Sequence, residues 1–110
     1  MFTRYVAAAA LAAPLLVALA AQAEAKQARC YNTDDGYYAC DFRQFGGDGS
    51  FEISAPARPT YTIYIVGSGV ADGYADFGSG NRFLPGPFFR SNSDRACWVS
   101  EATQFAICAY

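Results

Sequence analysis

The sequence contains no histidine among its 110 residues. Histidine is the commonest general base, the commonest metal ligand and the usual pH switch in proteins, so its absence removes the simplest route to each of these roles. The serines therefore have no histidine to activate them, and none stands in the G-x-S-x-G setting of hydrolases. We expect a protein without enzymatic activity, catalytic residues or cofactors.

Closely spaced cysteine pairs, which zinc sites and thioredoxin-like redox centres use, are also missing. No EF-hand or calcium-repeat pattern accompanies the aspartates that stand beside glycines. We therefore expect no metal site. The four cysteines are separated by nine and ten residues within each neighbouring pair: Cys30, Cys40, Cys97 and Cys108.

The sequence has little excess charge of either sign, with 8 basic and 10 acidic residues and a net charge of −2. Proteins that bind nucleic acid or anionic membranes usually carry a clear excess of basic residues. We therefore expect no nucleic-acid partner, and instead an unknown protein or glycan partner. The composition leaves the oligomeric state open.

An alanine-rich apolar segment opens the sequence. Arg4 precedes an uncharged run at residues 6–21, which is shorter than the roughly 20 residues that span a bilayer. Small residues then alternate with polar ones, which predicts cleavage after Ala23 or Ala25. We interpret residues 1–25 as a helical secretory signal peptide. This predicts a periplasmic or secreted protein with no membrane attachment after cleavage.

Residues 26–110 form a single expected domain of about 85 residues. A chain of this size buries only roughly 60–65% of its unfolded surface, so additional covalent stabilisation is expected. An even number of cysteines in an exported chain favours structural disulfides.

Alternation and turn residues, rather than helical spacing, characterise the chain after residue 25. The strongest expected strand is 60–66, which is rich in β-branched and aromatic residues and places Tyr61, Ile63 and Ile65 on one face. Gly73 indicates either a bulge or a close approach of the backbone to another group. Seven further short strands are expected at 37–45, 50–54, 70–77, 82–84, 88–91, 95–100 and 105–110.

Seven or eight short strands about ten residues apart predict an all-β domain, either a small antiparallel sandwich or a barrel. The connections are too short for parallel crossovers. We expect Tyr38, Cys40 and Phe42 to share one face of their strand, and Phe51 and Ile53 to share a face of theirs.

Hairpin geometry predicts a disulfide between Cys97 and Cys108. If the last two strands turn around residues 101–104, the two cysteines are directly opposite at a non-hydrogen-bonded position, with Cα atoms about 4.5 Å apart. That separation is within the range that a disulfide tolerates. The alternative connectivity joins Cys30 with Cys108 and Cys40 with Cys97.

The same counting applies near the start of the domain. If residues 34–36 form a three-residue loop with Gly36 in the left-handed conformation, Thr33 pairs with Tyr37. Cys30 is then directly opposite Cys40, which predicts a second local disulfide.

Aromatic residues are abundant, with nine phenylalanines, eight tyrosines and one tryptophan. They fit either a sugar- or peptide-binding face or the core of a small β-domain that has few leucines. Trp98 is the first candidate for an exposed binding platform, although its expected pairing with Ile107 suits a core residue equally well.

Two resemblances bear on function. The segments LPGPFFRS (84–91) and ACWV…ICAY (96–110) make the chain similar to small uncharacterised exported proteins of Gram-negative bacteria, a resemblance that implies no activity. Residues 79–83, Ser-Gly-Asn-Arg-Phe, resemble the Ser-Gly-x-x-Tyr motif of periplasmic inhibitors of c-type lysozyme, which are small β-barrels. Phe83 replaces the tyrosine, and the family's second motif, ending Lys-Gly, has no counterpart. This resemblance makes Ser79 and Arg82 candidate binding residues.

The sequence thus predicts a small exported, disulfide-stabilised β-domain that acts as a non-catalytic binding or envelope-associated protein. A periplasmic lysozyme inhibitor and a carbohydrate-binding module are the alternatives.

Overall fold

A computed structural model describes residues 24–110 of the chain; residues 1–23, which include most of the predicted signal peptide, lie outside this part. No helix in the described part is long and apolar enough to cross a bilayer. The strands of the described residues are β1 (Lys26–Asn32), β2 (Gly36–Phe45), β3 (Ser50–Ser54), β4 (Thr60–Gly67), β5 (Val70–Asp76), β6 (Asn81–Phe83), β7 (Phe88–Arg90), β8 (Cys97–Ser100) and β9 (Ala106–Ala109).

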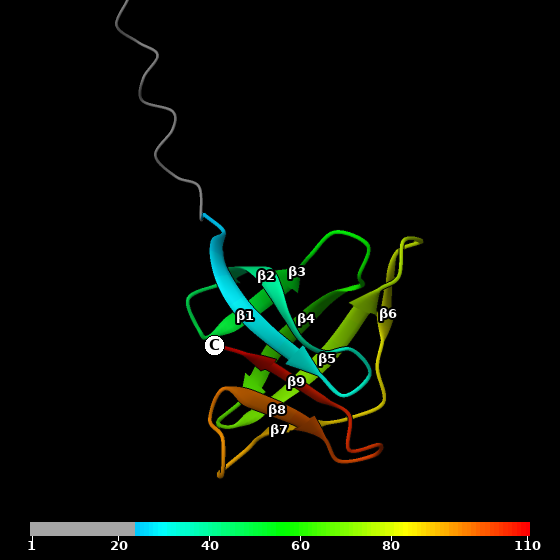
Figure 1. Cartoon of the computed structure of the whole chain (residues 1–110). Helices are drawn as coiled ribbons and strands as arrows, with labels where there is room; N and C mark the ends of the chain where they lie inside the picture. The colour runs from blue at the N-terminus through cyan, green and yellow to red at the C-terminus, as the bar shows by residue number, and fades with distance from the viewer. Residues whose placement is uncertain (1–23) are drawn as a thin grey trace, which may run out of the picture.

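Eight of these strands close into an antiparallel barrel. The order is β4-β3-β2-β1-β9-β8-β7-β5, and β5 pairs again with β4. Figure 1 shows β9 between β1 and β8, which is where the two ends of the meander meet. The ninth strand, β6, pairs only with β5 among the described strands and lies outside the ring. The all-β prediction is confirmed, and of its two architectures the barrel is the one adopted.

The core lies inside the barrel and follows the expected alternation. Tyr61 and Ile63 of β4 are buried, and Ile65 packs against the core from the end of the same strand. Phe51 and Ile53 of β3 are buried in the same way. Large aromatic and smaller aliphatic side chains together fill the interior, as is usual for barrels of eight strands. The predicted inward faces of these two strands are confirmed.

Gly73 is the point at which β5 makes room for the ring of Phe88. A Cβ atom at Gly73 would lie 2.6 Å from Cε1 of Phe88, closer than any normal contact. Phe88 has no exposed surface, so its ring cannot swing aside into solvent. Gly73 therefore marks a close approach and not a bulge; the irregularity lies in β4, between Ile65 and Gly67.

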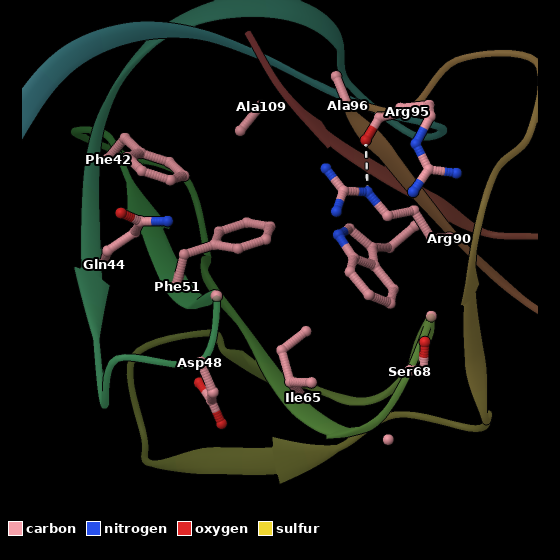
Figure 2. Close-up of a pocket in the computed structure, with 14 residues that line it drawn as sticks. Phe42, Gln44, Asp48, Phe51, Ile65, Ser68, Arg90, Arg95, Ala96 and Ala109 are labelled. Atoms are coloured by element: carbon pink, nitrogen blue, oxygen red, sulfur yellow. Dashed lines mark hydrogen bonds between the residues drawn. The ribbon is translucent and has the colours of Figure 1, made fainter.

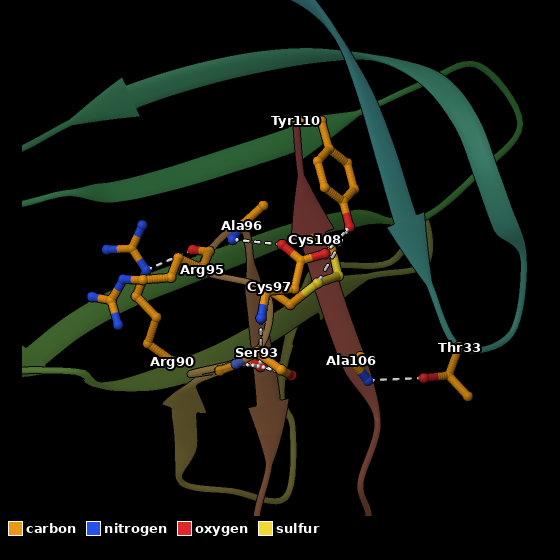
Figure 3. The surroundings of a disulfide bond; sticks show 11 residues. Thr33, Arg90, Ser93, Arg95, Ala96, Cys97, Ala106, Cys108 and Tyr110 are labelled. Atoms are coloured by element: carbon orange, nitrogen blue, oxygen red, sulfur yellow. Dashed lines mark hydrogen bonds between the residues drawn. A yellow bond between two sulfur atoms is a disulfide. The ribbon is translucent and has the colours of Figure 1, made fainter.

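The C-terminal hairpin has the predicted register. Cys97 is opposite Cys108, with a Cα–Cα distance of 4.0 Å, and the two cysteines are bonded. Ser100 donates its backbone N–H to the carbonyl of Phe105 at 2.9 Å, which closes the expected four-residue loop. Figure 3 shows this disulfide between the two neighbouring strands.

The N-terminal disulfide joins Cys30 and Cys40 as predicted, but the predicted register is wrong. Cys30 is opposite Tyr38, and Cys40 is two residues further along β2, so the bridge runs diagonally over a Cα–Cα distance of 5.9 Å. The loop comprises residues 33–35, and Gly36, with φ of 74°, already belongs to β2.

Two disulfides are consistent with folding in an oxidising, extracytoplasmic compartment.

The side chain of Asn32 explains the register. Its Oδ1 accepts hydrogen bonds from the backbone N–H groups of Asp34 and Asp35, at 2.9 and 2.8 Å, and its Nδ2 donates to the Asp35 carboxylate. Short polar side chains often organise turns in this manner. Because Asn32 closes the turn one residue earlier than Thr33 would, every pair along β1 and β2 shifts.

Asn32→Ala should lower the free energy of unfolding by about 1–2 kcal/mol. The substitution removes three hydrogen bonds from a fully buried side chain, while the exposed loop amides can still bond to water. Urea denaturation measures the change, with Asp34→Ala as a control in the same loop. A loss no larger than that of the control would contradict the role assigned to Asn32.

Candidate functional site

One mouth of the barrel contains a cavity of about 300 Å³. Closed barrels of eight strands commonly bind ligands at their mouths. The wall is made by the ends of β2, β4, β7 and β9, by the starts of β3 and β8, and by three of the connecting loops. Figure 2 shows the residues that line it: Phe42, Gln44, Asp48, Gly49, Phe51, Ile65, Gly67, Ser68, Gly69, Arg90, Arg95, Ala96, Trp98 and Ala109.

The floor of the cavity is apolar. Phe42 and Phe51 stack with their ring centroids 5.2 Å apart, and Ile65 and Trp98 continue the apolar surface. Trp98 is only 4% exposed. It therefore belongs to the core and contributes to the cavity wall, so it is not the exposed platform that the sequence suggested.

Two arginines stand together on one side of the mouth. The Nε–H of Arg90 donates to the carbonyl of Arg95 at 2.7 Å, and the Arg90 guanidinium carbon lies 5.5 Å from the centre of the Trp98 ring. Figures 2 and 3 both show the two guanidinium groups side by side. Neither arginine takes part in the ion pairs found among residues 24–110, which are Arg43–Glu52 and Arg58–Asp35.

The acidic residue of the cavity lies away from these arginines. Figure 2 shows Asp48 across the cavity from Arg90 and Arg95. The hydroxyl and the backbone N–H of Ser50 hold the pKa of Asp48 below its usual value, so this carboxyl is ionised at neutral pH. The positive charge on the opposite side therefore remains without a carboxylate partner inside the cavity.

The loop between β7 and β8, which carries Arg95, is fixed by a disulfide and by hydrogen bonds. The Cys97–Cys108 disulfide follows Arg95 by two residues, and the Tyr110 hydroxyl donates to the Asp94 carboxylate at 2.5 Å. This bond, with a second from the N–H of Ala96, lowers the pKa of Asp94, and the same contact raises the pKa of Tyr110. The position of Arg95 is thus defined by groups on both sides of it.

The other two predicted binding residues lie elsewhere. Ser79 is in the β5–β6 turn and Arg82 is on β6, and both are exposed. Oδ1 of Asp76 accepts from the N–H groups of Gly78 and Gly80 and orders this turn. The structure therefore does not bring Ser79 and Arg82 together with Trp98, and their role in binding lysozyme stays a prediction.

Arg90 and Arg95 were missed by the sequence reasoning. The available signal was the pair of arginines that flank the polar segment 91–94, in a chain with no lysine after Lys26. Nothing in that spacing indicates that the loop turns both guanidinium groups to the same cavity.

Comparisons with known proteins give no relative: no family model, curated protein or solved structure matches the chain. All four cysteines are in disulfides. Within the described residues, no three acidic or cysteine side chains are grouped so as to hold a metal ion. The chain is a small disulfide-bonded β-barrel with a cavity at one mouth that two arginines line.

Proposed function

We propose that this protein is a non-catalytic binding protein, exported to the periplasm or the medium, that holds an amphipathic anion in the mouth of its barrel. The observation that carries the proposal is the pair of arginines that form no ion pair within residues 24–110 and stand beside a cavity with an apolar floor. Uncompensated guanidinium groups at a cavity favour an anionic ligand, because charge-assisted hydrogen bonds to carboxylate, sulfate or phosphate are the strongest that arginine makes.

The arrangement suits such a ligand in two ways. Arg90 is already oriented by its bond to the Arg95 carbonyl and its contact with Trp98, so little side-chain freedom is lost on binding. Its Nε is occupied, which leaves the terminal nitrogens for the ligand. The apolar floor takes the hydrocarbon part, and a cavity of about 300 Å³ is at the small end for ligand sites.

The titratable groups that line the cavity are Asp48 and the two arginines, and none of them is placed to exchange a proton with an anion held by the arginines. Arginine stays protonated in proteins, and Asp48 is ionised and lies on the opposite side from the bound anion. We therefore assign binding without turnover.

Binding can be followed through Trp98, the single tryptophan of the chain, because it lines the cavity. Hexanoate and hexyl sulfate should change its fluorescence in a saturable manner, whereas hexanol and hexylamine of the same length should bind far more weakly. Added salt should weaken the binding of the anions, because the guanidinium groups are open to solvent. Equal responses to the anion and the amine would contradict the proposal.

Arg90→Gln and Arg95→Gln should each weaken hexyl sulfate binding by about tenfold, the effect of losing one charge-assisted hydrogen bond. Arg82→Gln is the matched control, because Arg82 is exposed and lies outside this cavity. Titration midpoints are compared rather than absolute fluorescence, since Arg90 itself contacts Trp98. The proposal fails if the three variants bind alike.

A further inference from the structure

A row of four aromatic rings crosses the outside of the barrel, away from the arginine cavity. Phe45, Tyr64, Tyr74 and Phe83 come from β2, β4, β5 and β6. Successive ring centroids are 5.2, 5.7 and 5.4 Å apart. The row therefore continues from the barrel wall onto the extra strand β6, which is not one of the eight strands of the closed barrel.

The register of the strands explains how the rings meet. Tyr74 and Phe83 are directly opposite each other, and Tyr64 is diagonal to Tyr74 across the β4–β5 pair. Phe45 is opposite Ser50 of the intervening strand β3. Since Ser50 is small and buried, the rings of Phe45 and Tyr64 come into contact above it.

The rings differ in exposure. Tyr64 is 46% exposed and Phe83 is 62% exposed. Tyr74, which lies between them, and Phe45, at the other end of the row, are half-buried. Neighbouring rings are inclined to one another by 71°, 82° and 64°, so each ring supports the next edge to face. Tyr64 and Phe83 are thus two separate exposed platforms, with Tyr74 filling the space between them.

Hydrogen-bond acceptors accompany these platforms. Asp72 is opposite Tyr64 on the same face, and it forms no ion pair within residues 24–110. Asn81 lies two residues before Phe83 and shares its face. Two arginines adjoin the row. Arg43 lies 5.5 Å from the centre of the Phe45 ring but is already paired with Glu52. Arg82 precedes Phe83 on β6 and therefore lies on the opposite face of the strand, with its guanidinium carbon 6.0 Å from the centre of the Phe77 ring. A partner that complements this surface donates hydrogen bonds and has apolar faces, and it carries no excess negative charge.

We propose that the row formed by Phe45, Tyr64, Tyr74 and Phe83 binds a neutral polysaccharide. The C–H faces of two sugar rings stack on Tyr64 and Phe83, and sugar hydroxyls donate to Asp72 and the Asn81 carbonyl. The convex outer wall suits a long polymer that lies across the strands, whereas a small ligand needs a cavity. This surface is separate from the anion site, so the two proposals stand or fall independently.

Affinity electrophoresis in native gels tests the proposal, with mixed-linkage β-glucan, xyloglucan, galactomannan or dextran cast into the gel. The protein should be retarded by at least one of these. Tyr64→Ala and Phe83→Ala should each reduce the apparent association constant about tenfold, as truncation of an interface aromatic typically does. Tyr37→Ala is the matched control, since Tyr37 is 54% exposed on β2 and lies outside the row.

The contrary outcomes are equally definite. Absence of retardation in all four gels would overturn the proposal, as would equal retardation of Tyr64→Ala, Phe83→Ala and Tyr37→Ala. A dimer in sedimentation equilibrium that Phe83→Ala dissociates, without retardation by any polysaccharide, would assign the row to self-association instead. Circular dichroism of each variant checks that a loss of binding is not a loss of folding. Because Tyr64, Phe83 and Tyr37 are exposed, their replacement by alanine should leave the fold intact.

Discussion

Replacement of Cys97 and Cys108 by serine together should lower the melting temperature by about 10–20 °C. The bridge closes a segment with a sequence separation of 11 residues, for which the chain-entropy model gives roughly 2.5–3 kcal/mol. In a domain of this size, each kcal/mol corresponds to about 4–8 °C. Thermal unfolding followed by circular dichroism measures the shift.

The Cys30→Ser, Cys40→Ser double variant is the matched control. Its bridge has a separation of 10 residues, so its effect on stability should be similar. Only the loss of the Cys97–Cys108 bridge should weaken anion binding, because only this bridge adjoins Arg95 at the cavity. Non-reducing proteolysis of the protein with all four cysteines should release a peptide that contains Cys97 and Cys108 and no other cysteine. A Cys30–Cys108 peptide, or an unchanged melting temperature, would contradict the hairpin assignment.

Gly73→Ala should lower the free energy of unfolding by about 2–3 kcal/mol, near the upper end for overpacking of a core. The new Cβ would lie 2.6 and 2.9 Å from two ring atoms of Phe88, a side chain without exposed surface. Relief therefore requires movement of β5 or β7 rather than of one flexible side chain. Urea denaturation measures the change.

Gly67→Ala provides the control for Gly73→Ala. Gly67 has an ordinary backbone conformation, and a Cβ there would meet only the Cβ of Val70, at 4.0 Å. Its substitution should change stability by less than about 1 kcal/mol, as do most exposed positions. Phe88→Leu introduced into Gly73→Ala should recover part of the loss, because the smaller side chain vacates the ring position. Similar losses in both glycine variants, or no recovery, would show that the Phe88 contact is not the cause.

Local patterns in the sequence were sufficient for the strands and their faces. The alternation in β4 places Tyr61 and Ile63 inside because successive side chains of a strand point to opposite faces. The pairing of Cys97 with Cys108 follows from loop length alone, since a four-residue loop leaves one register. The same counting failed at Cys30 and Cys40, where the side chain of Asn32 closes the turn and moves the register.

Only the tertiary structure decided the closure of the barrel and the composition of its sites. The barrel closes through β1 and β9, which are far apart in the sequence, and no local pattern distinguishes this pairing from the open edges of a sandwich. Closure buries Trp98, which a hairpin alone would leave open on one face. It also brings Arg90 and Arg95 to a cavity whose floor comes from β2, β3, β4 and β8, because residues distant along the chain converge at the mouth of a closed sheet.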